Sequence, residues 1–152
     1  MSPRDPAGRA LDLMARVDAE VRDRIAEAVD FVCLDIMAQA RQAHDLPAMT
    51  PDNAADRAEF DASVETFLTR LGDELPAALD ERQRQSVEAA AERDGGDRVS
   101  RLLSVQVALA KLLPDYWQRF EETRAGYAAG ATNPATASGR NRSGWLGRLL
   151  GG

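Results

Sequence analysis

Residues 9–44 have the sequence RALDLMARVDAEVRDRIAEAVDFVCLDIMAQARQAH, and this stretch decides the fold class. Apolar side chains recur along it at helical spacing, in two series: Met14, Val21 and Ala28, then Ile25 and Val32. At 1.5 Å per residue, one continuous helix here would be about 50 Å long. It should end near Pro47, since a proline pushes the preceding residue out of the helical region. The stretch predicts an elongated helical bundle.

The rest of the chain continues the helical pattern. Thr50-Pro51 is typical of a capped helix start, and a last long helix should follow Asp97 and run to about residue 127. Pro114 should kink or restart that helix, because proline lacks a backbone donor. Residues 76–93 are either a third helix or a kinked extension of the second.

The composition supports an all-α fold. Hydrophobic residues make up 44% of the chain but aromatics only 5%, and β-branched residues are few. We therefore expect an elongated three- to four-helix bundle over residues 9–127, after a disordered N-terminus at residues 1–8. Residues 128–143 should be a flexible, disordered linker, because their Gly, Ala, Thr, Asn, Pro and Ser cannot offset the entropy of ordering.

Charge is distributed unevenly along the chain. All 25 acidic residues lie at or before Glu122, whereas residues 123–152 hold four arginines and no acid. The body therefore carries a net charge of −10 and the C-terminal part +4. An acidic body argues against nucleic-acid binding, which needs a basic face. A small basic tail is typical of binding to an anionic membrane or an acidic groove.

Neither a signal peptide nor a run of about 18 apolar residues is present. We accordingly expect a cytoplasmic protein, held peripherally at the inner face of the membrane. The single cysteine, Cys33, excludes an internal disulfide and is expected to be an inert packed thiol.

Residues 144–152, GWLGRLLGG, form an amphipathic motif after the linker. On a helix, four apolar side chains fall within an arc of about 140° and Arg148 points elsewhere. These four are Trp145, Leu146, Leu149 and Leu150. Arg140 and Arg142 lie just upstream, where they could contact anionic headgroups. Tryptophan prefers the membrane interface, so the motif predicts a short interfacial helix.

This motif resembles the C-terminal membrane-targeting sequence of the division-site ATPase MinD, a family with the pattern Gly-Phe-Leu-x-Arg-Leu-Phe-Gly-Gly. The resemblance covers nine residues and implies that the four apolar side chains insert while Arg148 contacts headgroups. ATPase activity is not implied, because the chain has no Walker-type phosphate loop.

One tail should bind weakly. Burying four such side chains contributes roughly 6–12 kcal/mol, and ordering about seven residues costs roughly 1 kcal/mol or more each. Stable attachment would need several tails on one particle, so we expect a homo-oligomer, most simply a dimer through the long helices. Two alternatives stay open: the tail docks in the groove of a protein partner or shell, or it docks on its own bundle.

Few residues of the sequence suggest a catalytic site. His44 is the only histidine, too few for a carboxylate-bridged di-iron bundle with two Glu-x-x-His motifs. Asp35 and Gln39 share a helix face and should interrupt the apolar stripe. The stretch Asp35-Ile36-Met37-Ala38-Gln39 is similar to the Asp-Ile/Leu-Thr-Gly-Gln signature of the chemotaxis phosphatase CheZ. That resemblance implies that Gln39 orients the attacking water and Asp35 engages the response regulator's lysine.

Three aromatic residues beside Pro114 are the remaining candidates: Tyr116, Trp117 and Phe120. They are expected to pack in the core at the kink, and an exposed Trp117 would make them a candidate partner patch. No pattern for a cofactor or metal is found. The sequence thus favours a non-enzymatic helical adaptor or scaffold, tethered to a membrane by its tail and binding a protein partner through its bundle.

Overall fold

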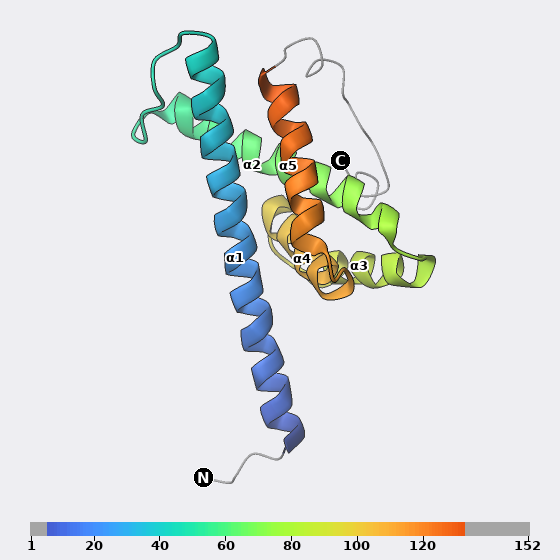
Figure 1. The fold of residues 1–152 in the computed structure, drawn as a ribbon. Coiled ribbons are helices and arrows are strands. Elements are labelled where there is room, and N and C mark those ends of the chain that lie inside the picture. Colours follow the sequence, from blue (N-terminus) through green and yellow to red (C-terminus); the bar gives the residue numbers. More distant parts are fainter. Residues whose placement is uncertain (1–5, 133–152) are drawn as a thin grey trace.

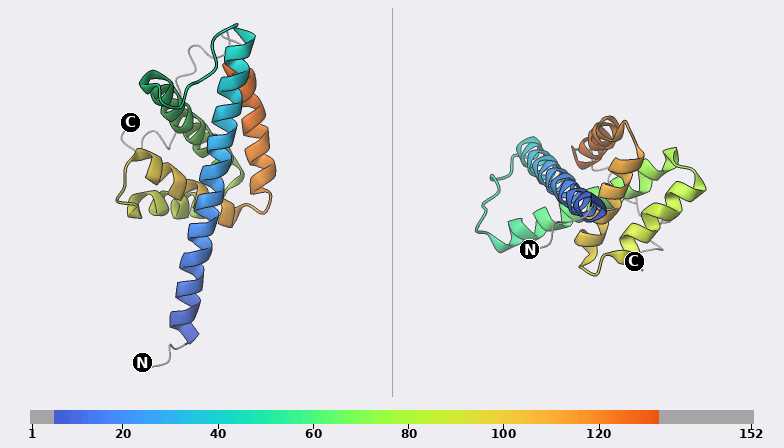
Figure 2. Two further views of the ribbon diagram at one scale, coloured as in Figure 1. Left: turned by 90° about the vertical axis from the view of Figure 1, so that its left-hand side faces the viewer. Right: turned by 90° about the horizontal axis from the view of Figure 1, so that it is seen from below.

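The computed structural model describes residues 6–132 and is all-α over that range. The helices follow in the order α1 (Pro6–Ala43), α2 (Ala54–Glu74), a short 3₁₀ helix (Leu75–Ala78), α3 (Glu81–Arg93), α4 (Arg98–Leu112) and α5 (Tyr116–Thr132). Helices α2 to α5 gather around the C-terminal half of α1, whose N-terminal turns protrude beyond them (Figures 1 and 2). No helix within this range combines the length and apolar content needed to span a bilayer.

Residues 6–132 form five α-helices in place of the predicted three or four, because two breaks are complete. Residues 76–93 are a separate helix: Asp80 accepts a hydrogen bond from the Gln83 backbone, and the Gln83 side chain caps the Asp80 N–H in return. At Pro114 the long last helix restarts instead of kinking, so α4 and α5 are distinct. Asp97 caps α4 as predicted. The predicted start at Thr50-Pro51 is wrong, since Asn53 caps α2 instead.

The outer boundaries also differ from those predicted. Residues 6–8, expected to be disordered, belong to α1, where Pro6 takes the first helical position that tolerates proline. Helix α5 extends to Thr132, into the expected linker. Tyr127 stabilises its last turns by stacking on Phe67 at 5.2 Å and by a 2.8 Å hydrogen bond with Ser63. Residues 133–143 of the expected linker and the motif at 144–152 lie outside the described residues.

Helix α4 is central, since it contacts each of the other four α-helices. Its fully buried Leu102, Val105 and Leu109 meet the apolar faces of those neighbours. Phe67 from α2 and Phe120 from α5 pack edge to face with ring centroids 5.4 Å apart. The core therefore lies around α4 and excludes the first turns of α1.

The predicted stripe on α1 is only half buried. Ile25 and Val32 are in the core as expected, and Val21 and Ala28 pack at its edge. Met14 is 57% exposed, which corrects the prediction that it lies on the buried stripe. The apolar periodicity continues into the first turns of α1, but the other helices do not extend far enough to cover these turns (Figure 1).

Candidate functional surfaces

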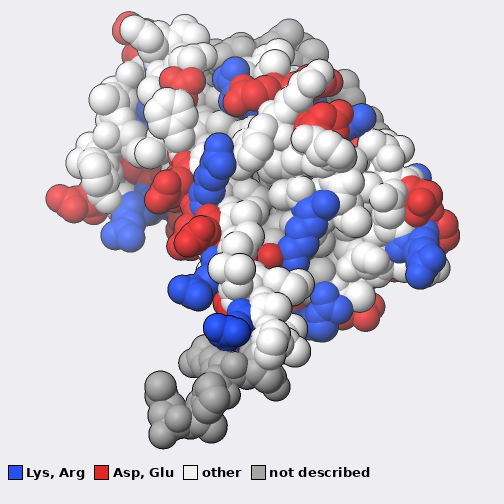
Figure 3. All heavy atoms as spheres, turned by 60° about the horizontal axis from the view of Figure 1, so that its bottom comes forward, with Lys and Arg blue, Asp and Glu red and all other residues white. Residues whose placement is uncertain are grey.

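The first candidate surface is the protruding part of α1, which we call the α1 arm (residues 6–20). Four of its large apolar side chains are exposed: Leu11 (66%), Leu13 (56%), Met14 (57%) and Val17 (47%). A helix of this length is marginal in water by itself, and it gains stability when a partner covers its apolar side. Figure 3 looks toward the arm end of the molecule and shows positive and negative side chains interspersed on that face. The arm is thus an apolar strip within a mixed-charge surface.

The second candidate is a groove of about 410 Å³ between α1 and α5, which we call the α1–α5 groove. Ala28, Phe31 and Val32 line one wall, and Trp117 and Phe120 line the other. At the rim lie three charged side chains: Asp35, Glu121 and Arg124. A volume of this size suits an apolar side chain of a peptide or ligand.

Phe31 is the most exposed large apolar residue of this groove, with 71% of its surface open to solvent. Trp117 is half-buried, and the Arg24 guanidinium lies over its ring, 5.1 Å from the centroid. The sequence singled out Trp117 but not Phe31. The sequence could not show that Phe31 is exposed, because Phe31 belongs to the same apolar run as the buried residues Val32 and Cys33.

The other two predicted aromatic candidates are core residues. Tyr116 and Phe120 are 2% and 1% exposed, so Tyr116 offers no surface to a partner and Phe120 only backs the α1–α5 groove. The Tyr116 hydroxyl donates a 2.8 Å hydrogen bond to Oε1 of buried Gln106. The expected packing at the kink therefore holds for these two residues, and only Trp117 reaches the surface.

Asp35 and Gln39 lie together but not in the apolar seam. The Gln39 side-chain amide donates a 3.0 Å hydrogen bond to the Asp35 carboxylate, and Gln39 is exposed. Their predicted interruption of the buried stripe is wrong, because Gln39 is exposed and Asp35 is only half-buried, in the lining of the groove. The resemblance to the phosphatase signature stays a prediction.

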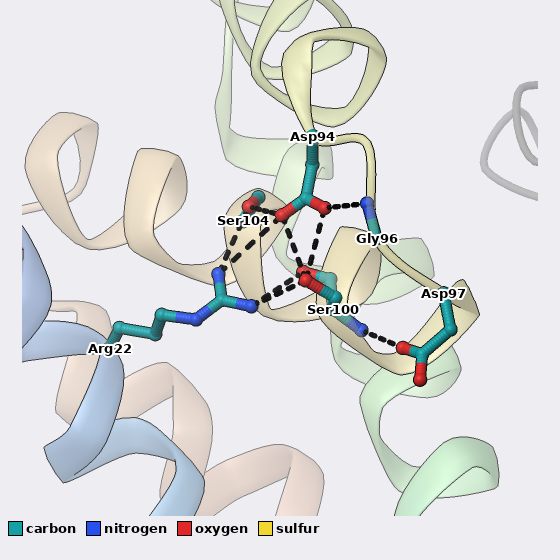
Figure 4. Close-up of polar contacts among 6 residues, drawn as sticks. All are labelled: Arg22, Asp94, Gly96, Asp97, Ser100 and Ser104. Carbon is teal, nitrogen blue, oxygen red and sulfur yellow. Dashed lines mark hydrogen bonds and ion pairs between the residues drawn. The ribbon is translucent and has the colours of Figure 1, made fainter.

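A third hollow, of about 510 Å³, lies between α1, α3 and α4. Asp94, at the end of α3, is its most connected side chain (Figure 4). Its carboxylate accepts hydrogen bonds from the Gly96 backbone at 2.7 Å and from the hydroxyls of Ser100 and Ser104 at 3.0 and 2.6 Å. Arg22 from α1 donates to both serine hydroxyls and lies 3.7 Å from the same carboxylate.

These contacts join three helices, and they do not form a nucleophilic site. The hydrogen bond from Ser104, then that of Gly96, lower the pKa of Asp94, which makes it a weak base. His44, the only histidine, lies just after the C-terminal end of α1, 22 residues beyond Arg22, and is exposed. Sequence reasoning missed this network, because Arg22 and Asp94 are 72 positions apart and each alone reads as a solvated charge.

We expect this network to make stability fall at low pH. Asp94 has a folded-state pKa below its ordinary value, so its contribution is complete above about pH 4 and is lost as the pH falls through the lowered pKa. The variant Asp94→Asn should therefore lose less thermal stability than the wild type between about pH 5 and pH 2. Melting curves across this range test it, with Asp23→Asn on exposed α1 surface as control. An equal fall in melting temperature with pH for the wild type and Asp94→Asn would contradict the prediction.

Cys33 is buried, and burial raises the pKa of its thiol to about 11, so it is protonated at neutral pH and not a nucleophile. Within residues 6–132, no group of three or more His, Cys, Asp or Glu side chains is placed to hold a metal ion. The predicted tail residues, from Arg140 to Leu150, lie outside the described residues.

No family model, curated protein or solved structure matches this chain. The features that can indicate its function are therefore the exposed apolar surfaces and the sequence of the tail.

Proposed function

We propose that this chain is a non-enzymatic helical adaptor, attached to an anionic membrane surface through residues 144–152 and holding a second copy or another protein on α1. The observation that carries the proposal is the exposed apolar side of α1, from Leu11 to Val17 in the arm and at Phe31 beside the groove. Large apolar groups gathered on one helix of a strongly acidic body favour a docking surface.

The arm also supports the oligomer that the membrane proposal needs. Pairing two arms would cover eight large apolar side chains, four from each chain, and would place two tails on one particle. Two weakly binding tails attach far more firmly than one, because the second binds at a high effective concentration. An adaptor with this design would respond to its own concentration as well as to lipid charge.

Co-sedimentation with vesicles tests the membrane attachment. The intact chain should pellet with vesicles containing anionic lipid, and less with neutral ones. Trp145→Glu should lower the vesicle affinity by about tenfold or more, because a charge replaces the largest inserted side chain. A chain ending at Ser143 should behave likewise, and Gln118→Glu, on the exposed surface of α5, serves as the matched control.

Absence of pelleting by the intact chain would contradict membrane attachment. The alternative adaptor would then apply, in which residues 144–152 dock in the groove of a protein partner or shell. If the tail docks in a protein partner, the isolated tail peptide and the intact chain should compete for that partner.

A further inference from the structure

We infer that the α1–α5 groove is the docking site for this chain's own residues 144–152. The tail would then bind either the groove or a membrane, and the regulatory part of this inference rests on the proposed function. The body has an open apolar groove, and the same chain carries an amphipathic motif that could occupy it.

The groove has the chemistry to receive that motif. Phe31 and Trp117 offer aromatic surface on opposite walls, and Phe31 is 71% exposed on a body of net charge −10. Such a surface favours a ligand that is apolar on one side and carries positive charge. Helices α1 and α5 lie side by side here, so a short third helix could lie in the groove between them (Figure 1).

The tail has the complementary features. Its four apolar side chains would fall on one side if the motif were helical, and Arg140, Arg142 and Arg148 all carry positive charge. At the groove rim, Asp35 accepts a hydrogen bond from the neutral amide of Gln39, which does not neutralise its charge. An arginine of the tail would balance that carboxylate. Attraction between the acidic body and the basic tail acts in the same direction.

The chain is long enough to make this contact. Helix α5 ends at Thr132, about 12 Å along the helix axis from Arg124 at the groove rim. The eleven residues from 133 to 143 can span up to about 36 Å when extended. The motif can therefore turn back along α5 and enter the groove.

This occupant is favoured over a second copy or a free partner by its tether. A connection of only eleven residues would hold the tail at an effective concentration of about millimolar, so even a weak complex would be mostly formed. The same four apolar side chains cannot occupy the groove and a bilayer together. Anionic lipid would then draw the tail out of the groove, and the groove would become free for a partner.

The chain's two tryptophans allow a direct test without lipid. The indole N–H of Trp145 gives one of two side-chain indole signals in an NMR spectrum of the full chain. We expect the chemical shift of this Trp145 signal to differ from its value in the free 144–152 peptide. In Phe31→Ser, which removes aromatic surface from the groove without adding charge, it should move to the free-peptide position. In the control Leu46→Ser, a 57% exposed apolar residue in the loop after α1 and outside both the arm and the groove, the signal should stay at the wild-type position.

The same variants give a second readout on vesicles. Releasing the tail should raise the affinity of Phe31→Ser for anionic vesicles by about threefold to tenfold over wild type, and the control Leu46→Ser should bind as the wild type does. A Trp145 signal at the free-peptide position in the wild-type chain, or one that Phe31→Ser leaves unmoved, would overturn the inference.

The two measurements together distinguish failure of the membrane proposal from failure of the groove assignment. If the Trp145 signal depends on Phe31 but no variant binds vesicles, the groove assignment stands and membrane attachment is lost. If the wild-type chain binds vesicles while its Trp145 signal matches the free peptide, membrane attachment stands and the groove assignment is lost.

Discussion

Replacing Phe67 by alanine is expected to destabilise the protein by about 3–5 kcal/mol, whereas Phe31→Ala should cost about 1 kcal/mol or less. Phe67 is fully buried and packs on Phe120 and Tyr127, so truncation leaves a cavity between α2 and α5. Phe31 has 71% of its surface in water. If the tail docks in the groove as we infer, that smaller cost includes the loss of the docked tail.

Urea unfolding followed by circular dichroism measures both changes. Since a domain of this kind has about 5–15 kcal/mol of total stability, Phe67→Ala should move the midpoint strongly or leave the chain largely unfolded. Phe31→Ala is the matched control, because the same side chain is removed from a surface position. Similar midpoint shifts for the two variants would show that Phe31 is a core residue and would contradict the open groove.

Tyr116→Phe is expected to cost about 1–3 kcal/mol, although it deletes a single oxygen atom. Burial raises the pKa of Tyr116, so its phenol stays protonated and donates to Gln106. Among the described residues, Nε2 of Gln106 already lacks a hydrogen-bond partner. Removing the hydroxyl would leave the other end of this buried amide unpaired as well.

A double-mutant cycle isolates this effect. Gln106→Met alone should also destabilise, because it leaves the buried Tyr116 hydroxyl without its acceptor. The double variant should recover most of the lost stability, since both polar groups are then replaced by apolar ones of similar shape. Strictly additive costs in urea unfolding would contradict the pairing of Tyr116 with Gln106.

The elements of the fold were largely predictable from the sequence because their signals are local. Asp97 caps α4 through the Ser100 backbone, three residues away, and Pro114 ends a helix by lacking its own donor. The start predicted at Thr50 was misplaced by three residues because Asn53 offers a competing cap. The start predicted at residue 9 came too late because Pro6 can itself take the first helical position. Whether residues 76–93 form their own helix depended on the capping box between Asp80 and Gln83.

The candidate surfaces were less predictable. The apolar motif at 144–152 was visible in the sequence, since its spacing and its arginines follow one another along the chain. The groove was not, because Phe31 and Trp117 are far apart in sequence and meet only when α1 packs beside α5. The Arg22–Asp94 contact escaped for the same reason.

By itself, the sequence determined that the chain is helical, where most helices break, and that its charge divides between an acidic body and a basic tail. Those properties arise from interactions over a few residues or from composition alone. Only the tertiary structure decided which apolar residues are buried: Ile25 and Met14 carry similar side chains on one helix, yet only Ile25 meets α4 and its neighbours. Burial depends on where the other helices end, and the periodicity of one helix carries no information about that.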